Sequence, residues 1–122
     1  MTKVVFYKSS NTFWCFEEVG HSGLAEEGKD ILCASISAMT MLVVNAIEEV
    51  YKSKIQYEVD EESTVIRVKA RGALPKHETD EKKRYAISGL LEAYYRQLGL
   101  LQEEFPKNLR VSVVERDVDD SF

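Results

Sequence analysis

The amino-acid sequence predicts an α+β two-layer sandwich, in which two helices pack on one face of a mixed, mostly antiparallel sheet. Two observations predict this fold class. Segments of strand and helix periodicity follow one another in the order β-β-α-β-β-α-β, and two helices most economically cover one face of such a sheet. The length of 122 residues and the hydrophobic content of 44% are typical of one globular domain, which we expect to span residues 1–122.

The first nineteen residues predict a β-hairpin. Residues 3–7 are rich in β-branched and aromatic side chains, and Ser9-Ser10-Asn11 is a turn signal. Residues 12–19 then predict a second strand with Cys15 at its middle. We interpret Cys15 as a small buried hydrophobic residue.

A polar, glycine-rich loop is expected over residues 20–29, and its part from 22 to 29 is expected to be mobile. Asp30 is the expected N-cap of the first helix, whose apolar residues recur at helical spacing from Ile36 to Val50. The first half of this helix is apolar on every side, so we expect it to be largely buried. Its longest apolar run, residues 38–46, is too short to predict a membrane span.

The second half of the chain predicts two strands, a long helix and a last strand. Residues 55–60 alternate as a half-buried strand, and residues 64–70 follow as another. A helix is expected to begin near residues 78–80 and to end at Phe105-Pro106. Residues 109–113 form the last strand, and His77 in the connector is expected at the surface.

Charge and cysteine content exclude several function classes. The net charge of −5 disfavours direct binding of nucleic acid and suits a basic partner. No signal peptide is expected, so the two cysteines indicate reduced cytosolic thiols and a cytoplasmic location. The two cysteines and two histidines lack the spacing of a zinc site, and we expect no metal and no cofactor.

Cys33 and His21 are the candidate catalytic residues. A thiol near a helix N-terminus and beside an imidazolium is deprotonated more readily than an ordinary thiol, and the thiolate is the nucleophile. His21 precedes Cys33 across the flexible loop and would serve as its general base. Backbone N–H groups around Cys33 and Ala34 would hold an oxyanion.

Each of these residues also has a structural interpretation. A cysteine in a buried helix is usually a packing residue, and a histidine after Gly20 is usually a loop residue. Asp30 is either the helix cap or a third member that orients His21. Ser37, one turn beyond Cys33, is either directed toward the site or bonded to the main chain.

The residues Gly20-His21, Gly28-Lys29-Asp30-Ile31-Leu32-Cys33-Ala34 and Ser37 resemble the signature of the ribosomal-processing cysteine protease (Prp) family. That signature reads GH…G-x-D-I-V-C-A-x-x-S. Residues 44–47 and 103–107 also resemble the family, so the similarity spans nearly the whole chain. Ser22 and Leu32 depart from the usual alanine and valine without removing a group that the mechanism needs.

The resemblance implies a homodimeric bacterial cytosolic endopeptidase. The net charge and the short apolar runs predict no direct contact with nucleic acid or membrane. In that family the substrate is the N-terminal extension of large-subunit ribosomal protein number twenty-seven, a basic protein. The resemblance assigns Cys33 as nucleophile and His21 as general base, with Gly20, Asp30 and Ser37 as supporting positions. Two rival functions stay open, a non-catalytic ribosome-assembly adaptor and a redox sensor in which Cys15 pairs with Cys33.

Overall fold

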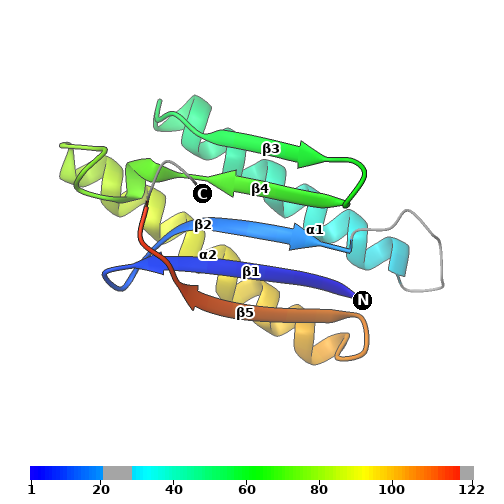
Figure 1. The fold of residues 1–122 in the computed structure, drawn as a ribbon. Helices are drawn as coiled ribbons and strands as arrows, with labels where there is room; N and C mark the ends of the chain where they lie inside the picture. The colour runs from blue at the N-terminus through cyan, green and yellow to red at the C-terminus, as the bar shows by residue number, and fades with distance from the viewer. Residues whose placement is uncertain (21–28, 119–122) are drawn as a thin grey trace.

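The computed structural model describes residues 1–20 and 29–118, without the side chains of residues 29 and 30. Five strands and two long helices follow one another along the chain (Figure 1). The strands are β1 (Thr2–Ser9), β2 (Thr12–Val19), β3 (Gln56–Asp60), β4 (Val65–Lys69) and β5 (Leu109–Glu115). The helices are α1 (Lys29–Asn45), which continues into a π-helical turn (Ala46–Val50), and α2 (Glu81–Glu104).

The sheet has the strand order β3-β4-β2-β1-β5, and both helices cover the same face of it (Figure 1). The β1–β5 pair is parallel, and the three other pairs are antiparallel. Ser10 and Asn11 link β1 to β2 with positive φ angles of 49° and 64°, as a two-residue hairpin turn requires. The predicted α+β fold and its order of elements are confirmed.

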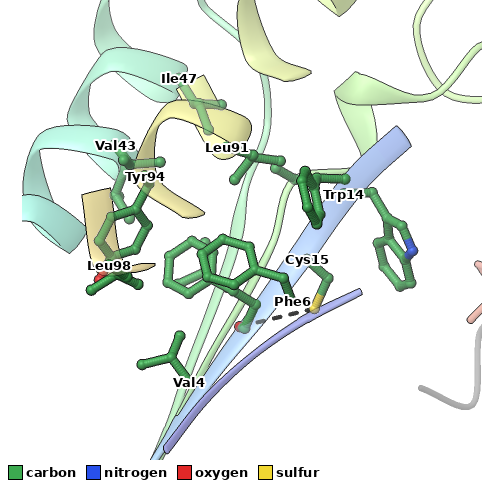
Figure 2. Close-up of a cluster of buried hydrophobic side chains, with 14 of the residues drawn as sticks. Val4, Phe6, Trp14, Cys15, Val43, Ile47, Leu91, Tyr94 and Leu98 are labelled. Carbon is green, nitrogen blue, oxygen red and sulfur yellow. Dashed lines mark hydrogen bonds between the residues drawn. The ribbon is translucent and has the colours of Figure 1, made fainter. Parts of the chain in front are cut away.

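Aromatic side chains from the sheet and from α2 form the centre of the core (Figure 2). The Tyr94 ring lies 5.7 Å from the Phe6 ring and 5.2 Å from the Phe16 ring, edge to face in both cases. Ile87, Leu91 and Leu98 of α2 are fully buried beside them. Burial of each such side chain stabilises the fold by about 1.5–3 kcal/mol. The buried residues of α2 recur at helical spacing and form its core-facing side.

The ends of α2 follow local rules. The Asp80 carboxylate accepts a hydrogen bond from the Lys82 backbone N–H at 2.9 Å, which makes Asp80 the N-cap. Phe105 ends the helix directly before Pro106, as predicted. His77, in the connector before α2, is exposed as expected.

The expectation that α1 is largely buried is wrong. Leu32, Ile36 and Ile47 are buried against the sheet and α2, but Ile31 and Leu42 are 68% and 67% exposed. Among the described residues, Ile31–Val50 is long and apolar enough to cross a membrane by length and composition alone, although the sequence predicts no membrane span. Core helices of soluble proteins pass the same test, and only 33% of this stretch is buried. The helix has one face in the core and one apolar face outside it.

Strand β3 is also more exposed than its alternating pattern predicted. Every residue from Gln56 to Asp60 is exposed, and Tyr57 and Val59 are 44% and 52% exposed. The reason is topological, because β3 is an edge strand that pairs only with β4. A strand in that position contacts less of the helical layer than a central strand does.

Candidate active site

Cys33 is the fifth residue of α1, and its thiol is free and partly exposed. The described part of α1 starts at Lys29, so Asp30 already lies within the helix. A cap precedes the first helical residue, and Asp30 is therefore not the N-cap that the sequence predicted. Whether Asp30 orients a histidine stays a prediction, because its side chain lies outside the described part.

The earlier start of α1 also affects the predicted oxyanion site. An N–H group inside a helix bonds to the carbonyl four residues earlier, which for Cys33 and Ala34 belongs to Lys29 and Asp30 of α1. The N–H groups of Cys33 and Ala34 therefore lie inside the hydrogen-bonded part of the helix. This placement does not favour an oxyanion role for those two N–H groups. Ala34, the next residue after Cys33, has an exposed side chain.

One side of α1 carries Cys33, Ser37 and Thr40, because residues four and seven positions apart share a helix face. Ser37 is exposed, and its side chain is not without an interaction partner. Thr40 is buried, and its hydroxyl donates a hydrogen bond to the Glu18 carboxylate on β2. The side of α1 that bears the thiol is therefore hydrogen-bonded to the C-terminal end of β2.

Glu18 is a buried carboxylate held by two hydroxyl groups. It is 1% exposed, and besides Thr40 it accepts a hydrogen bond from the Tyr94 hydroxyl at 3.0 Å. The Thr40 and Tyr94 hydroxyl oxygens lie 2.7 Å apart. Burial and then the nearby Glu18 charge raise the pKa of Tyr94, which keeps it a hydrogen-bond donor. Through Glu18, which lies two residues before Gly20, these hydrogen bonds connect β2 with α1 and α2.

Gly20 directly follows β2 and has a backbone conformation that favours glycine. Its φ is +81°, and a Cβ at this position would lie 2.6 Å from the Met1 carbonyl oxygen. A larger residue would therefore strain the backbone and displace the N-terminus. His21, the predicted base, and the predicted mobile loop up to residue 28 lie outside the described residues.

Cys15 is confirmed as a buried strand residue and is 0% exposed. It pairs in register with Tyr7 and Lys69, so it faces the side of the sheet opposite Phe16 and the helices. Burial, with the Glu17 charge as a smaller cause, raises the pKa of the Cys15 thiol to about 12. Cys33 belongs to a helix on the other side, so the geometry disfavours a Cys15–Cys33 disulfide and the redox-sensor hypothesis.

The buried cluster of Glu18, Thr40 and Tyr94 is not among the sites predicted from the sequence. An acidic residue at the end of a strand is usually exposed to solvent. Neither Thr40 nor Tyr94, which hold Glu18, is near it in sequence. The available signal was the period of two along β2, which places Glu18 on the same face as Phe16. Among the described residues, no group of three or more His, Cys, Asp or Glu side chains is arranged to hold a metal ion.

A family model described as "Cysteine protease Prp" matches residues 1–110. The chain belongs to the Prp family of cysteine proteases. No match to this chain is found among curated proteins.

Solved structures support the same fold. SMU.848 from Streptococcus mutans is 26% identical, with a TM-score of 0.79 over 95% of this chain and 96% of that one. The ribosomal processing protease Prp from Staphylococcus aureus, solved with a substrate peptide, is 19% identical. Its TM-score is 0.75 over 93% of this chain and all of that one. The same protease with a covalently linked product peptide gives 21% identity and a TM-score of 0.72 over the same shares.

Proposed function

We propose that this protein is a cysteine endopeptidase in which Cys33 is the nucleophile and His21 the general base. The observation that carries the proposal is a partly exposed thiol near the start of α1, at the signature position of a cysteine protease family. The Staphylococcus aureus protease, solved with a covalently linked product peptide, supports a covalent route for this chain as well.

The proposed reaction proceeds in two steps. The Cys33 thiol gives its proton to His21, and its sulfur attacks the scissile carbonyl carbon. The C–N bond then breaks, the amine leaves with the proton from His21, and a thioester remains on Cys33. Water gives a proton to His21 and attacks the thioester, which releases the acid product and restores the thiol.

The proposed substrate is the N-terminal extension of large-subunit ribosomal protein number twenty-seven, removed during bacterial ribosome maturation. The ribosomal processing role of the Staphylococcus aureus relative and the sequence signature support this assignment. The net charge of −5 favours approach of a basic substrate. The proposed location is the bacterial cytoplasm.

We further propose that the protein acts as a homodimer, as the resemblance implies. The apolar outer face of α1, formed by Ile31, Met41 and Leu42, is the described surface that a second copy would cover. An exposed apolar surface of this kind is typical of an interaction site.

Cleavage of the full-length ribosomal protein tests the proposed function. The purified chain is incubated with it, and masses are read over time. We expect loss of the extension with wild type and with Cys15→Ala, which removes the other thiol. Cys33→Ala and Cys33→Ser should fold, by thermal melt, but not cleave. Near wild-type cleavage by either folded Cys33 variant would refute cysteine catalysis, whereas binding of the ribosomal protein without cleavage by wild type would favour the adaptor hypothesis.

A further inference from the structure

A second candidate site lies where β4 ends and β3 begins. This pocket has a volume of about 900 Å³ and is lined by the segment before β3, by both strands and by the connector before α2. Cys33 is near the other end of α1. The helical stretch from Cys33 to Val50 is roughly 25 Å long at a rise of about 1.5 Å per residue. The pocket is therefore separate from the candidate active site.

The pocket is cationic, although the chain as a whole carries a net charge of −5. Four cationic side chains and two carboxylates line it. The cations are Lys52, Lys54, Lys69 and Arg71, and the carboxylates are Glu58 and Glu78. Positive charge concentrated in a concave site of an acidic protein favours a negatively charged ligand there.

Lys69 is unusually buried for a lysine. Its side chain is 6% exposed, and its ammonium lies 3.2 Å from the Glu58 carboxylate. Glu58 is half exposed and also lies 3.6 Å from the Arg67 guanidinium, which pairs more closely with Glu17, at 2.6 Å. Burial of an ammonium group is costly. A bound anion in the pocket would offset part of that cost.

The Arg71 side chain packs against a tryptophan ring that is not among the residues lining the pocket. Its guanidinium lies 5.9 Å from the centre of the Trp14 ring, in cation–π geometry. Within the described part of the chain, no carboxylate lies within ion-pair distance of Arg71. The next residue, Gly72, is fixed by close packing, because a Cβ there would lie 2.3 Å from the Ser53 Oγ. The guanidinium is thus pre-positioned for an anion.

We propose that this pocket binds a small phosphate-bearing molecule that carries two or more negative charges. A guanidinium matches phosphate oxygens in pairs, and lysine ammonium groups neutralise the remaining charge. The volume exceeds that of one phosphate and has room for an attached group. A basic peptide would be repelled, and a long nucleic acid would extend over the acidic remainder of the surface.

Pyrophosphate is the probe for this proposal, and Trp14 is the reporter. Trp14 is the only tryptophan of the chain, and Arg71 contacts its ring. We expect saturable quenching or enhancement of its fluorescence by pyrophosphate, with weaker affinity at about 0.2 M than at about 0.05 M NaCl. Calorimetry on the same samples gives the Kd without relying on Trp14.

Three substitutions separate a binding site from general charge. Arg71→Gln and Lys54→Gln should each weaken pyrophosphate binding at least tenfold, whereas Glu58→Gln should tighten it, because a competing carboxylate is removed. Arg96→Gln is the matched control, since Arg96 is exposed on α2 and pairs with Glu92 at 3.5 Å. Lys54 is exposed and tests the site if Arg71→Gln perturbs folding.

The proposal is overturned if wild type shows no saturable pyrophosphate binding, or if Arg96→Gln weakens binding as much as Lys54→Gln. Binding of an RNA hairpin without binding of pyrophosphate also overturns it. Cys33→Ala should bind pyrophosphate as tightly as wild type, so the result does not depend on the proposed protease activity.

Discussion

The two cysteines place the same thiol group in opposite surroundings. Cys15 is fully buried with a pKa raised to about 12, whereas Cys33 is partly exposed on α1. At neutral pH we expect iodoacetamide to modify Cys33 at least tenfold faster than Cys15 in the folded protein, measured by peptide mass. In denaturant the two rates should converge. Equal rates in the folded state would contradict the described burial.

The hydroxyl of Tyr94 is expected to stabilise the fold through Glu18. Tyr94→Phe keeps the ring contacts with Phe6 and Phe16 but removes one hydrogen bond to a buried carboxylate. We expect the free energy of unfolding to fall by about 1–3 kcal/mol. Tyr85→Phe is the control, because Tyr85 is 82% exposed and its change should stay within about 0.5 kcal/mol. Equal effects in urea unfolding would refute a role for this cluster in stability.

The raised pKa of Cys15 predicts a loss of stability in alkali. The folded state keeps this thiol protonated from its ordinary value of 9.0 up to about 12, while the unfolded chain releases the proton. The stabilisation is therefore complete below pH 9 and is lost as pH rises toward 12, with a slope of up to about 1.4 kcal/mol per pH unit. Cys15→Ala should show a shallower decline in unfolding free energy over this window. A decline as steep as that of wild type would contradict the prediction.

Single residues were predictable where one local property decides their environment. The burial of Cys15 followed from its place among aromatic strand residues, and the cap at Asp80 lay within the predicted helix start. Glu18 was not predictable in the same way. Its burial depends on hydroxyl groups from two helices that the chain brings to it only when folded.

At the scale of elements, α1 shows why an apolar helix is ambiguous in sequence. Apolar residues on every side indicate either full burial or one face in the core and another available to a partner. The sheet and α2 cover only one face of α1, so the outer face stays exposed. The exposure of β3 was hard to predict for a similar reason. The alternation of apolar and polar residues in a strand does not show whether the strand lies at the edge or in the centre of the sheet.

The outer face of α1 predicts the behaviour of one substitution. Leu42→Glu places a charge on the surface proposed to bind a second copy, and we expect it to convert a dimer into a monomer in light scattering. Leu100→Glu is the control, because Leu100 is 55% exposed on α2, outside that surface, and the dimer should persist. A monomeric wild type, or dissociation by both variants alike, would contradict this assignment.

At the scale of the whole molecule, the fold class and the order of elements followed from periodicity, but part of the site did not. The shift in the start of α1 moved Asp30 and the N–H groups of Cys33 and Ala34 into the helix. Sequence rules locate helix ends only within a few residues. A shift of that size leaves the fold unchanged and yet alters which backbone groups can bind an oxyanion.

The central claim is that Cys33 forms a covalent bond with the substrate, and an acid quench tests it most directly. The protein is mixed with the full-length ribosomal protein, quenched in acid within the first turnover, and its intact mass and peptide map are measured. We predict a thioester between Cys33 and the N-terminal extension, removed by hydroxylamine and lacking in Cys33→Ala. An adduct on another residue, or cleavage by folded Cys33→Ala without any adduct, would contradict the account.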